Sequence, residues 1–315
     1  MRFLGRALFF VPAAALLLLS SSAFSQNNIV YRDHHLHPVL MNPATAGSQY
    51  VPAAGLSFRK QWLGIDQSPS SILASASLRL GNYDIYNPRM LINRSNFRSR
   101  EKVGLGFGLY TDQNGAASTR GLNMAYAYHI KLQRSSLSFG LSGNVEQSRL
   151  DGTSWDPLAP NDPLLPALKE SYFGYNANIG VCYYGPVFLF GFAANQVLPL
   201  QNNFSKEERV KQDFILHGTY MFRSRESLKL EPALNIRYLD YKAVEFDIQT
   251  KIYIQHSHWI SLTYRSYGAL NLGAGIWVKG YYLAYDWEVN LSSMARYSAG
   301  THSIHLGINL GMRSY

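Results

Sequence analysis

Residues 102–132 read "KVGLGFGLYTDQNGAASTRGLNMAYAYHIKL", and this stretch decides the fold class. From Val103 to Leu109 an apolar side chain stands at every second position, with a glycine between neighbours. From Leu122 to Ile130 large apolar residues alternate again, this time with Asn, Ala and His. Successive side chains of a β-strand point to opposite faces, so each half is predicted to be a strand with one apolar face.

The same alternation recurs along the chain, in segments of roughly ten residues separated by turn residues. We predict fourteen strands, at 53–62, 70–80, 101–111, 119–132, 135–147, 174–184, 186–194, 213–222, 228–238, 243–255, 258–265, 269–278, 281–290 and 302–313. An even number suits a closed barrel with both ends on the periplasmic side. Segment 186–194, apolar on both faces, and segment 228–238, which contains Pro232, fit the pattern least well.

Composition favours a membrane barrel over a soluble protein. Aromatic residues make up 14% of the chain and charged residues only 16%, against a usual charged share of about 25%. In a soluble β-sandwich or lipocalin-like barrel the second face of each strand meets water, whereas here it carries mainly Gly, Ala, Asn and Ser. Such small residues suit an enclosed lumen, and no run of about 18 apolar residues follows the N-terminus. We therefore expect an all-β, transmembrane antiparallel outer-membrane β-barrel of about 14 strands, spanning residues 53–315.

Aromatic residues and loops give this barrel a predicted orientation. Tyr and Trp near segment ends are expected to form an interfacial girdle, namely Trp62, Tyr110, Trp259, Tyr281 and Trp287. The long loops 148–173, 195–212 and 291–301 follow odd-numbered strands and are expected outside the cell. Segment 81–100 breaks this rule, and its spacing offers no explanation.

The N-terminus reads as a secretory signal peptide over residues 1–25, with cleavage before Gln26 and delivery to the outer membrane. No cysteine lies near the cleavage site, and the single Cys182 cannot form an intramolecular disulfide. The formal charge is +9, but the basic residues are dispersed, so nucleic acid is excluded as a partner. Outer-membrane lipid is the expected neighbour of basic residues near the barrel ends.

Residues 33–49, "DHHLHPVLMNPATAGSQ", raise the question of a metal site. Three histidines and an aspartate fall within five residues, yet a structural zinc site needs four ligands on a fixed frame, and no second cluster is near. We predict no metal and treat the histidines as incidental. Pro38, Pro43 and Pro52 predict an extended, periplasmic or lumenal segment over 26–52, which would plug the barrel or dock a partner.

No arrangement of residues predicts catalysis or a cofactor. Ser303 and His305 lie close together in "THSIH", but no orienting carboxylate pairs with the serine and no Gly-x-Ser-x-Gly turn exists. The last strand instead carries a pattern typical of a barrel-assembly signal, formed by His305, Gly307, Leu310 and Met312. Strand phase turns charges of both signs inward, where they are expected to pair across the lumen: Arg59, Lys131, Glu146, Lys229, Glu231, Arg237, Glu245, Asp247, Lys251, Asp286, Glu288 and Arg313.

From about Tyr31 to its end, the chain resembles the PorP/SprF family of outer-membrane proteins. "PVLMNPATAG" is similar to the family's N-terminal signature, here Asn42, Pro43, Ala44, Ala46 and Gly47, with Thr45 in place of the usual aromatic residue. "LSFRKQWLGIDQSPSS" matches an Arg-x-Gln-Trp segment carried by Arg59 and Trp62. The 102–132 hairpin and the closing segments "YRSYGALNLGAGIWV", "YYLAYDW" and "GTHSIHLGINL" also match, although Ser303 stands where the family usually has Glu.

The resemblance implies a non-enzymatic component of the type IX secretion and gliding systems of Bacteroidetes. Its partners would be periplasmic and outer-membrane components of the machinery, together with cargo that carries a sorting domain, such as an adhesin. The signature residues Asn42, Pro43, Ala44, Gly47, Arg59 and Trp62 are then candidates for partner docking. A Pro-rich loop supplies a candidate extracellular cargo patch at Trp155, Pro157, Leu158, Leu164 and Leu165. The alternatives are a channel for small-molecule or lipid uptake and, third, an outer-membrane hydrolase.

Overall fold

The computed structural model describes residues 36–49, 52–80, 102–150, 171–198, 212–225, 228–239, 243–254, 258–278 and 280–309. The strands are β1 (Ala53–Lys60), β2 (Ser70–Arg79), β3 (Val103–Asn114), β4 (Ala117–Lys131), β5 (Ser136–Leu150), β6 (Ser171–Tyr184), β7 (Phe188–Asn195), β8 (Asp213–Tyr220), β9 (Phe222–Arg225), β10 (Leu228–Leu239), β11 (Ala243–Ile254), β12 (His258–Arg265), β13 (Ala269–Val278), β14 (Tyr281–Asn290) and β15 (Thr301–Asn309). Three short helical elements accompany them, α3 (Pro38–Met41), η3 (Pro43–Thr45) and η8 (Ser293–Arg296).

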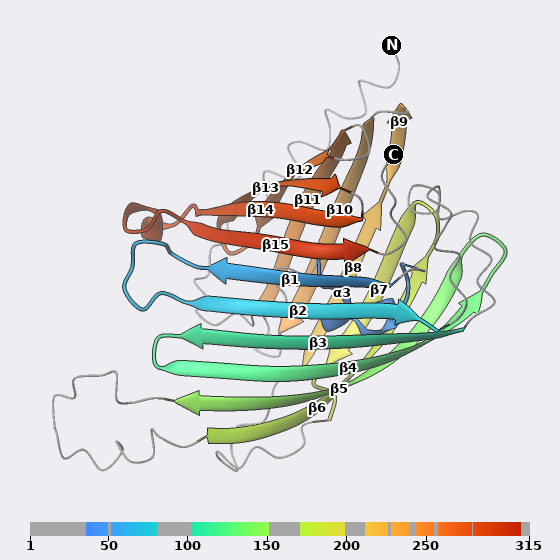
Figure 1. The fold of residues 1–315 in the computed structure, drawn as a ribbon, viewed down its shortest axis with the longest axis horizontal. Coiled ribbons are helices and arrows are strands. Elements are labelled where there is room, and N and C mark those ends of the chain that lie inside the picture. The colour runs from blue at the N-terminus through green and yellow to red at the C-terminus, as the bar shows by residue number, and fades with distance from the viewer. Residues whose placement is uncertain are drawn as a thin grey trace.

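The strands form one closed antiparallel barrel (Figure 1). Apart from β8 and β9, strands that are neighbours in sequence pair with each other. β10 pairs with β11, and β1 pairs with β15 over eight residues, which closes the ring. Strands β8 and β9 both pair with β10, one after the other, and therefore occupy a single position in the wall. The barrel thus has fourteen strand positions, as the sequence predicts.

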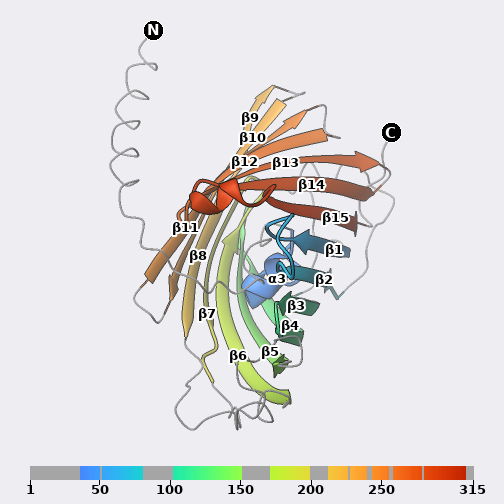
Figure 2. The same ribbon diagram turned by 90° about the vertical axis from the view of Figure 1, so that its left-hand side faces the viewer.

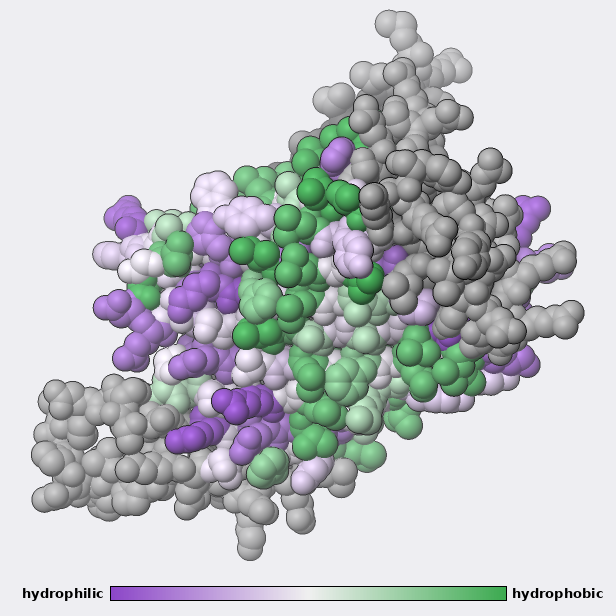
Figure 3. Space-filling view, viewed as in Figure 1, coloured by the Kyte–Doolittle hydropathy of each residue, from purple (hydrophilic) through white to green (hydrophobic). Residues whose placement is uncertain are grey.

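Alternation along the strands separates a lipid face from a lumenal face. Large apolar side chains such as Phe107, Met124 and Phe192 are exposed on the outside, where they form a hydrophobic band across the strands (Figure 3). At the end of the barrel that carries the β1–β2 loop, this band gives way to hydrophilic residues. Within the described ranges, no helix is long and apolar enough to cross a membrane.

Two members of the predicted aromatic girdle face the lumen instead. Tyr110 is buried and its hydroxyl donates to the carboxylate of Glu146. Trp259 is buried beneath the ammonium group of Lys251, which lies 4.5 Å from the ring centroid. Both sit at inward positions of their strands, because strand phase outweighs nearness to a strand end.

Residues 36–49, the described part of the segment before β1, are not extended, contrary to the prediction from the prolines. Pro38 and Pro43 begin two short helical turns, α3 and η3, both inside the barrel (Figure 2). Asn42, the residue before Pro43, has an extended backbone with φ of −139° and ψ of 110°, whereas His37, before Pro38, has φ of −124° and ψ of 54° and is not extended. Both residues stay outside the helical region, as a following proline requires, and proline itself is well suited to the first position of a helical turn.

Candidate functional site

Residues 37–48, named the plug here, form a compact unit inside the lumen. Much of its backbone bonding is internal: the Asn42 nitrogen donates to the Pro38 oxygen at 2.9 Å, and the Ala46 nitrogen to the Pro43 oxygen at 3.1 Å. The Ser48 nitrogen donates to the Thr45 oxygen at 2.9 Å. Because these turns satisfy much of their own backbone, the plug can enter the lumen without a strand partner.

Six glycines on the inner wall allow the plug to approach closely. They form the glycine seat: Gly104, Gly106, Gly108, Gly140, Gly180 and Gly191. A methyl group at Gly140 would overlap the backbone nitrogen of Ala44, and one at Gly104 would overlap the carbonyl of Ala46. The small residues that suggested an enclosed lumen in the sequence thus have a more specific purpose, since they leave room for the backbone of the plug.

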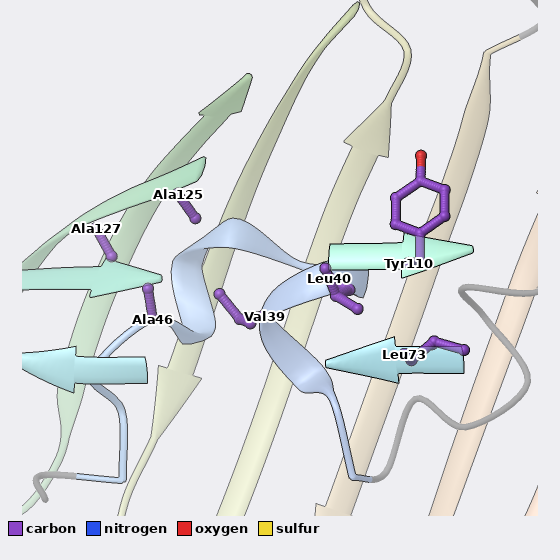
Figure 4. Close-up of a cluster of buried hydrophobic side chains, with 7 residues drawn as sticks. All are labelled: Val39, Leu40, Ala46, Leu73, Tyr110, Ala125 and Ala127. Carbon is purple, nitrogen blue, oxygen red and sulfur yellow. The ribbon is translucent and has the colours of Figure 1, made fainter. Parts of the chain in front are cut away.

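Apolar side chains of the plug pack into three clusters on the wall. Val39, Leu40 and Ala46 meet inward-facing residues of β2, β3 and β4, with the side chains of the cluster drawn in Figure 4: Val39, Leu40, Ala46, Leu73, Tyr110, Ala125 and Ala127. Met41 packs on Ala193 and Ile215, and Ala44 on Cys182 and Tyr184. Burying an aliphatic side chain of this size contributes roughly 1.5–3 kcal/mol, so Val39, Leu40 and Met41 supply much of the binding free energy of the plug.

Asn42 is fully buried where the plug crosses from β6 to β7. Its side-chain nitrogen lies 3.2 Å from the carbonyl oxygen of Val181, 3.4 Å from that of Phe192 and 2.9 Å from Nε2 of His217. Its side-chain oxygen accepts from the Ala44 nitrogen at 3.0 Å. The carbonyls can only accept, so the site demands a side chain that donates on one side and accepts on the other, which a carboxamide does.

Wall side chains also bind the plug backbone near its C-terminal end. Ser138 donates to the Ala44 carbonyl at 2.7 Å, and His129 Nε2 lies 2.8 Å from the Ala46 carbonyl. The backbone nitrogen of Gly47, at φ +72°, donates to Ser77 at 2.8 Å. Gly47 is needed there, because a side chain would be strained at that φ and would meet the wall backbone at 3.0 Å.

At the other end of the plug, His37 joins a relay of five side chains. Its Nδ1 lies 2.7 Å from the hydroxyl of Ser75, and its Nε2 lies 2.6 Å from the hydroxyl of Ser57. The Ser57 hydroxyl lies 2.6 Å from Nδ1 of His305, whose Nε2 lies 2.8 Å from the carboxylate of Asp286. His37 is thus part of the site, and its treatment as incidental is wrong.

The relay runs without a break from Ser75 on β2 to Asp286 on β14. Each serine hydroxyl can both donate and accept, whereas the carboxylate of Asp286 can only accept. The relay therefore ties the plug to strands on both sides of the barrel closure.

Within the relay, Ser57, His305 and Asp286 follow the order of a hydrolytic triad. The sequence offered no carboxylate for His305 because Asp286 comes from β14 and Ser57 from β1, on either side of β15. Ser57 is 0% exposed, however, and its hydroxyl already bonds to both imidazoles. In this arrangement Ser57 links the plug to the closing strand of the barrel.

The lumenal wall next to β15 carries a buried charge cluster made of Arg59, Arg265, Tyr267 and Glu288. Glu288 accepts from Arg59 at 2.9 Å and from the Tyr267 hydroxyl at 2.9 Å, and Nε of Arg265 lies 3.4 Å from it. Arg237 also pairs with Glu245 on the next strand. Among the described residues these pairs join strands one or two places apart, so the expected pairing across the lumen is replaced by pairing along the wall. Lys131 is exposed at the end of β4 rather than inward.

The remaining predicted site residues are scattered. Trp62 lies in the β1–β2 loop at φ +49°, with its nitrogen 3.5 Å from the Thr301 hydroxyl. Gly307 lies beside the ring of Tyr282, which a methyl group would overlap. The rest lie outside the described residues: the signal peptide, His34, His35, segment 81–100, Leu310, Met312, Arg313 and the cargo patch Trp155, Pro157, Leu158, Leu164 and Leu165.

In the described part of the chain, no three His, Cys, Asp or Glu side chains come together in a way that could hold a metal ion. His37, the one described histidine of the 33–49 stretch, is bound by serines.

Comparison with known proteins identifies the family of this chain. A family model described as type IX secretion system membrane protein PorP/SprF matches residues 23–308. The chain belongs to this family. PorP/SprF membership makes the protein an outer-membrane component of type IX secretion, and the predicted resemblance is confirmed.

A solved structure, the transporter TbuX, shares the fold of this PorP/SprF protein. The toluene transporter TbuX of Ralstonia pickettii is 10% identical, with a TM-score of 0.51, 89% of this chain covered and 94% of TbuX. The CymD monoaromatic hydrocarbon channel is 12% identical, with a TM-score of 0.47, 87% of this chain covered and 91% of CymD. A search of curated proteins finds no match. At these identities the likeness to TbuX shows a shared barrel fold, and the family carries the functional conclusion.

Proposed function

We propose that this PorP/SprF protein is a plugged, non-enzymatic barrel that supports the export or surface anchoring of sorting-domain cargo, such as an adhesin, including cargo used in gliding. The proposal includes a signal peptide over residues 1–25 and a mature chain that begins at Gln26. Periplasmic components of the secretion machinery are the proposed partners of the N-terminal segment, and the loop with Trp155 and Leu164 is the proposed cargo patch.

The observation that carries the proposal is the plug itself. The signature residues Asn42, Pro43, Ala44 and Gly47 are the ones that seat the plug on the inner wall. A barrel that devotes these residues to filling its own lumen is better suited to binding and anchoring than to the free passage of solutes.

The rival function is a channel for small molecules or lipids. It predicts a continuous lumenal path and therefore a large, stable conductance of the full-length barrel in a planar bilayer. The proposed function predicts a small conductance that does not rise when hydrophobic solutes are added.

Affinity purification of the tagged full-length protein from native membranes tests the proposal. We expect recovery of type IX secretion components together with a cargo that carries a sorting domain. An equally tagged outer-membrane barrel from outside this family serves as the control and should recover neither. If the protein itself recovers neither, the proposed function is wrong.

A further inference from the structure

We infer that the lumenal face of β1–β8 is a peptide-binding site, and that the plug is its exchangeable resident ligand rather than a fixed part of the barrel. The inference rests on the geometry of the wall and does not depend on the proposed secretion function.

The first argument is the division of roles between wall and plug. The plug makes its own turns, as its internal backbone bonds show, and among the described residues it adds no strand to the barrel. The wall supplies the complementary features, namely the glycine seat and the hydroxyls of Ser57, Ser75 and Ser138. A self-contained segment on a preformed surface is how a peptide ligand binds its receptor.

The second argument is that the wall specifies the chemistry of its ligand position by position. Ser57 on β1 and Ser75 on β2 bind an imidazole. The wall at Gly106 and Gly108 leaves room for aliphatic side chains at two adjacent positions of the ligand. The carbonyls of Val181 and Phe192 require a hydrogen-bond donor, which is the side-chain nitrogen of Asn42. Nε2 of His217 lies 2.9 Å from the same nitrogen.

Small residues are required two and four positions after the asparagine, at Ala44 and Ala46. Gly140 admits only a closely approaching backbone at Ala44, and Ser138 and His129 bind the carbonyls of Ala44 and Ala46. The ligand class is therefore a short, mostly apolar peptide with a histidine, two adjacent aliphatic residues, an asparagine, and alanines two and four positions after the asparagine. A partner protein that carries such a segment would compete with the plug.

The third argument is that the wall beneath the plug carries aliphatic side chains on strands otherwise lined by polar residues. Leu73 on β2 and Ile215 on β8 are inward-facing and fully buried. Leu73 packs in the cluster with Val39 and Leu40, and Ile215 packs with Met41. Apolar positions matched to the apolar residues of one segment are a feature of a binding surface.

The test uses the full chain with its own plug displaced. Ala44→Glu places a carboxylate against the buried Cys182 and Tyr184 and should expel the plug without changing the wall. The double variant Asn42→Asp/Ala44→Glu is a second version of the same change. A fluorescent synthetic peptide of residues 36–49 is then titrated against each refolded barrel, and binding is followed by anisotropy. Far-ultraviolet circular dichroism and heat-modifiable gel mobility confirm that each barrel is folded.

We expect the peptide to bind the plug-displaced barrels tightly, and to enter the wild-type protein only at the higher concentrations at which it competes with the resident plug. A peptide with Asn42→Asp should bind roughly tenfold more weakly or worse, because it loses buried hydrogen bonds. Adding Gly140→Ala to the displaced barrel should abolish binding, whereas Gly143→Ala should not, because nothing lies within 4 Å of a methyl group at Gly143 on the same strand.

The inference is overturned if the peptide fails to bind folded, plug-displaced barrels, or if Gly140→Ala and Gly143→Ala affect binding equally. Recovery of secretion partners by the wild-type protein would be unaffected by either result, so the two proposals can fail separately.

Discussion

The carboxamide of Asn42 lies where strands β6 and β7 meet, and its nitrogen reaches a carbonyl on each. These two strands pair over only six residues, fewer than any other neighbouring positions of the described wall. One side chain of the plug therefore connects the two sides of the shortest pairing in the barrel. The sequence singled out Asn42 through the family signature, but not His217, which lies 175 residues away and shares no local pattern with it.

Replacing Asn42 should loosen the plug without dismantling the barrel. Asn42→Ala leaves the Ala44 nitrogen and His217 without this partner, which costs about 1–3 kcal/mol for a buried group. Asn42→Asp should cost more, because its carboxylate faces two carbonyl oxygens. Limited proteolysis of the folded protein should then show faster cleavage within residues 36–49, in the order Asp, Ala, wild type.

Gln113→Ala is the matched control, because Gln113 is an exposed amide on β3 and its loss should leave cleavage unchanged. Equal cleavage of the Asn42 variants and wild type would show that Asn42 does not hold the plug.

Strands β14, β15 and β1 form the element where the barrel closes and where its buried charges gather. Glu288 on β14 faces Arg59 on β1 and Arg265 on β12, and all three are nearly inaccessible to water. Strand phase predicted Arg59 and Glu288 as inward-facing, because alternation alone fixes the face of a strand residue. It could not predict which inward charges pair, since that depends on the register between strands distant in sequence.

Glu288→Gln should destabilise the closing strands. The substitution keeps the side-chain volume but leaves two buried guanidinium groups without their carboxylate, a change that costs about 3–5 kcal/mol. Thermal unfolding of the purified barrel, followed by tryptophan fluorescence, should show a clearly lower midpoint. Asp66→Asn, in the exposed β1–β2 loop, is the control and should leave the midpoint unchanged. A midpoint for Glu288→Gln equal to that of Asp66→Asn would refute the role of the cluster.

The sequence predicted the strands, because their apolar residues repeat at every second position. All fourteen strand positions were predicted, and their ends differ from the observed ones by a few residues, as at β3, which continues to Asn114. The plug has no period, and its prolines fit both an extended segment and the first residue of a helical turn. A usable signal was present at Leu73 and Ile215, which are apolar residues at inward positions of strands otherwise lined by polar ones.

At the scale of the whole molecule, the lumen has two unlike halves. The half formed by β2–β8 holds the plug on glycines and small apolar residues, and the half formed by β10–β15 together with β1 carries paired charges. The relay from Ser75 to Asp286 runs between these halves and ties the plug to the strand that closes the barrel. The central claim is that residues 37–48 occupy the lumen against β3–β7 in the folded protein.

The native Cys182 makes a direct measurement of this claim possible, because Ala44 packs against it inside the barrel. In the variant Ala44→Cys, mild oxidation of the folded protein should join residue 44 to Cys182, and mass spectrometry of proteolytic fragments should find the linked pair. The double variant Ala44→Cys/Cys182→Ala gives the baseline. A linked pair in most of the folded protein is the predicted result. Free thiols at both positions after oxidation, in a barrel that is otherwise folded, would contradict the placement of the plug in the lumen.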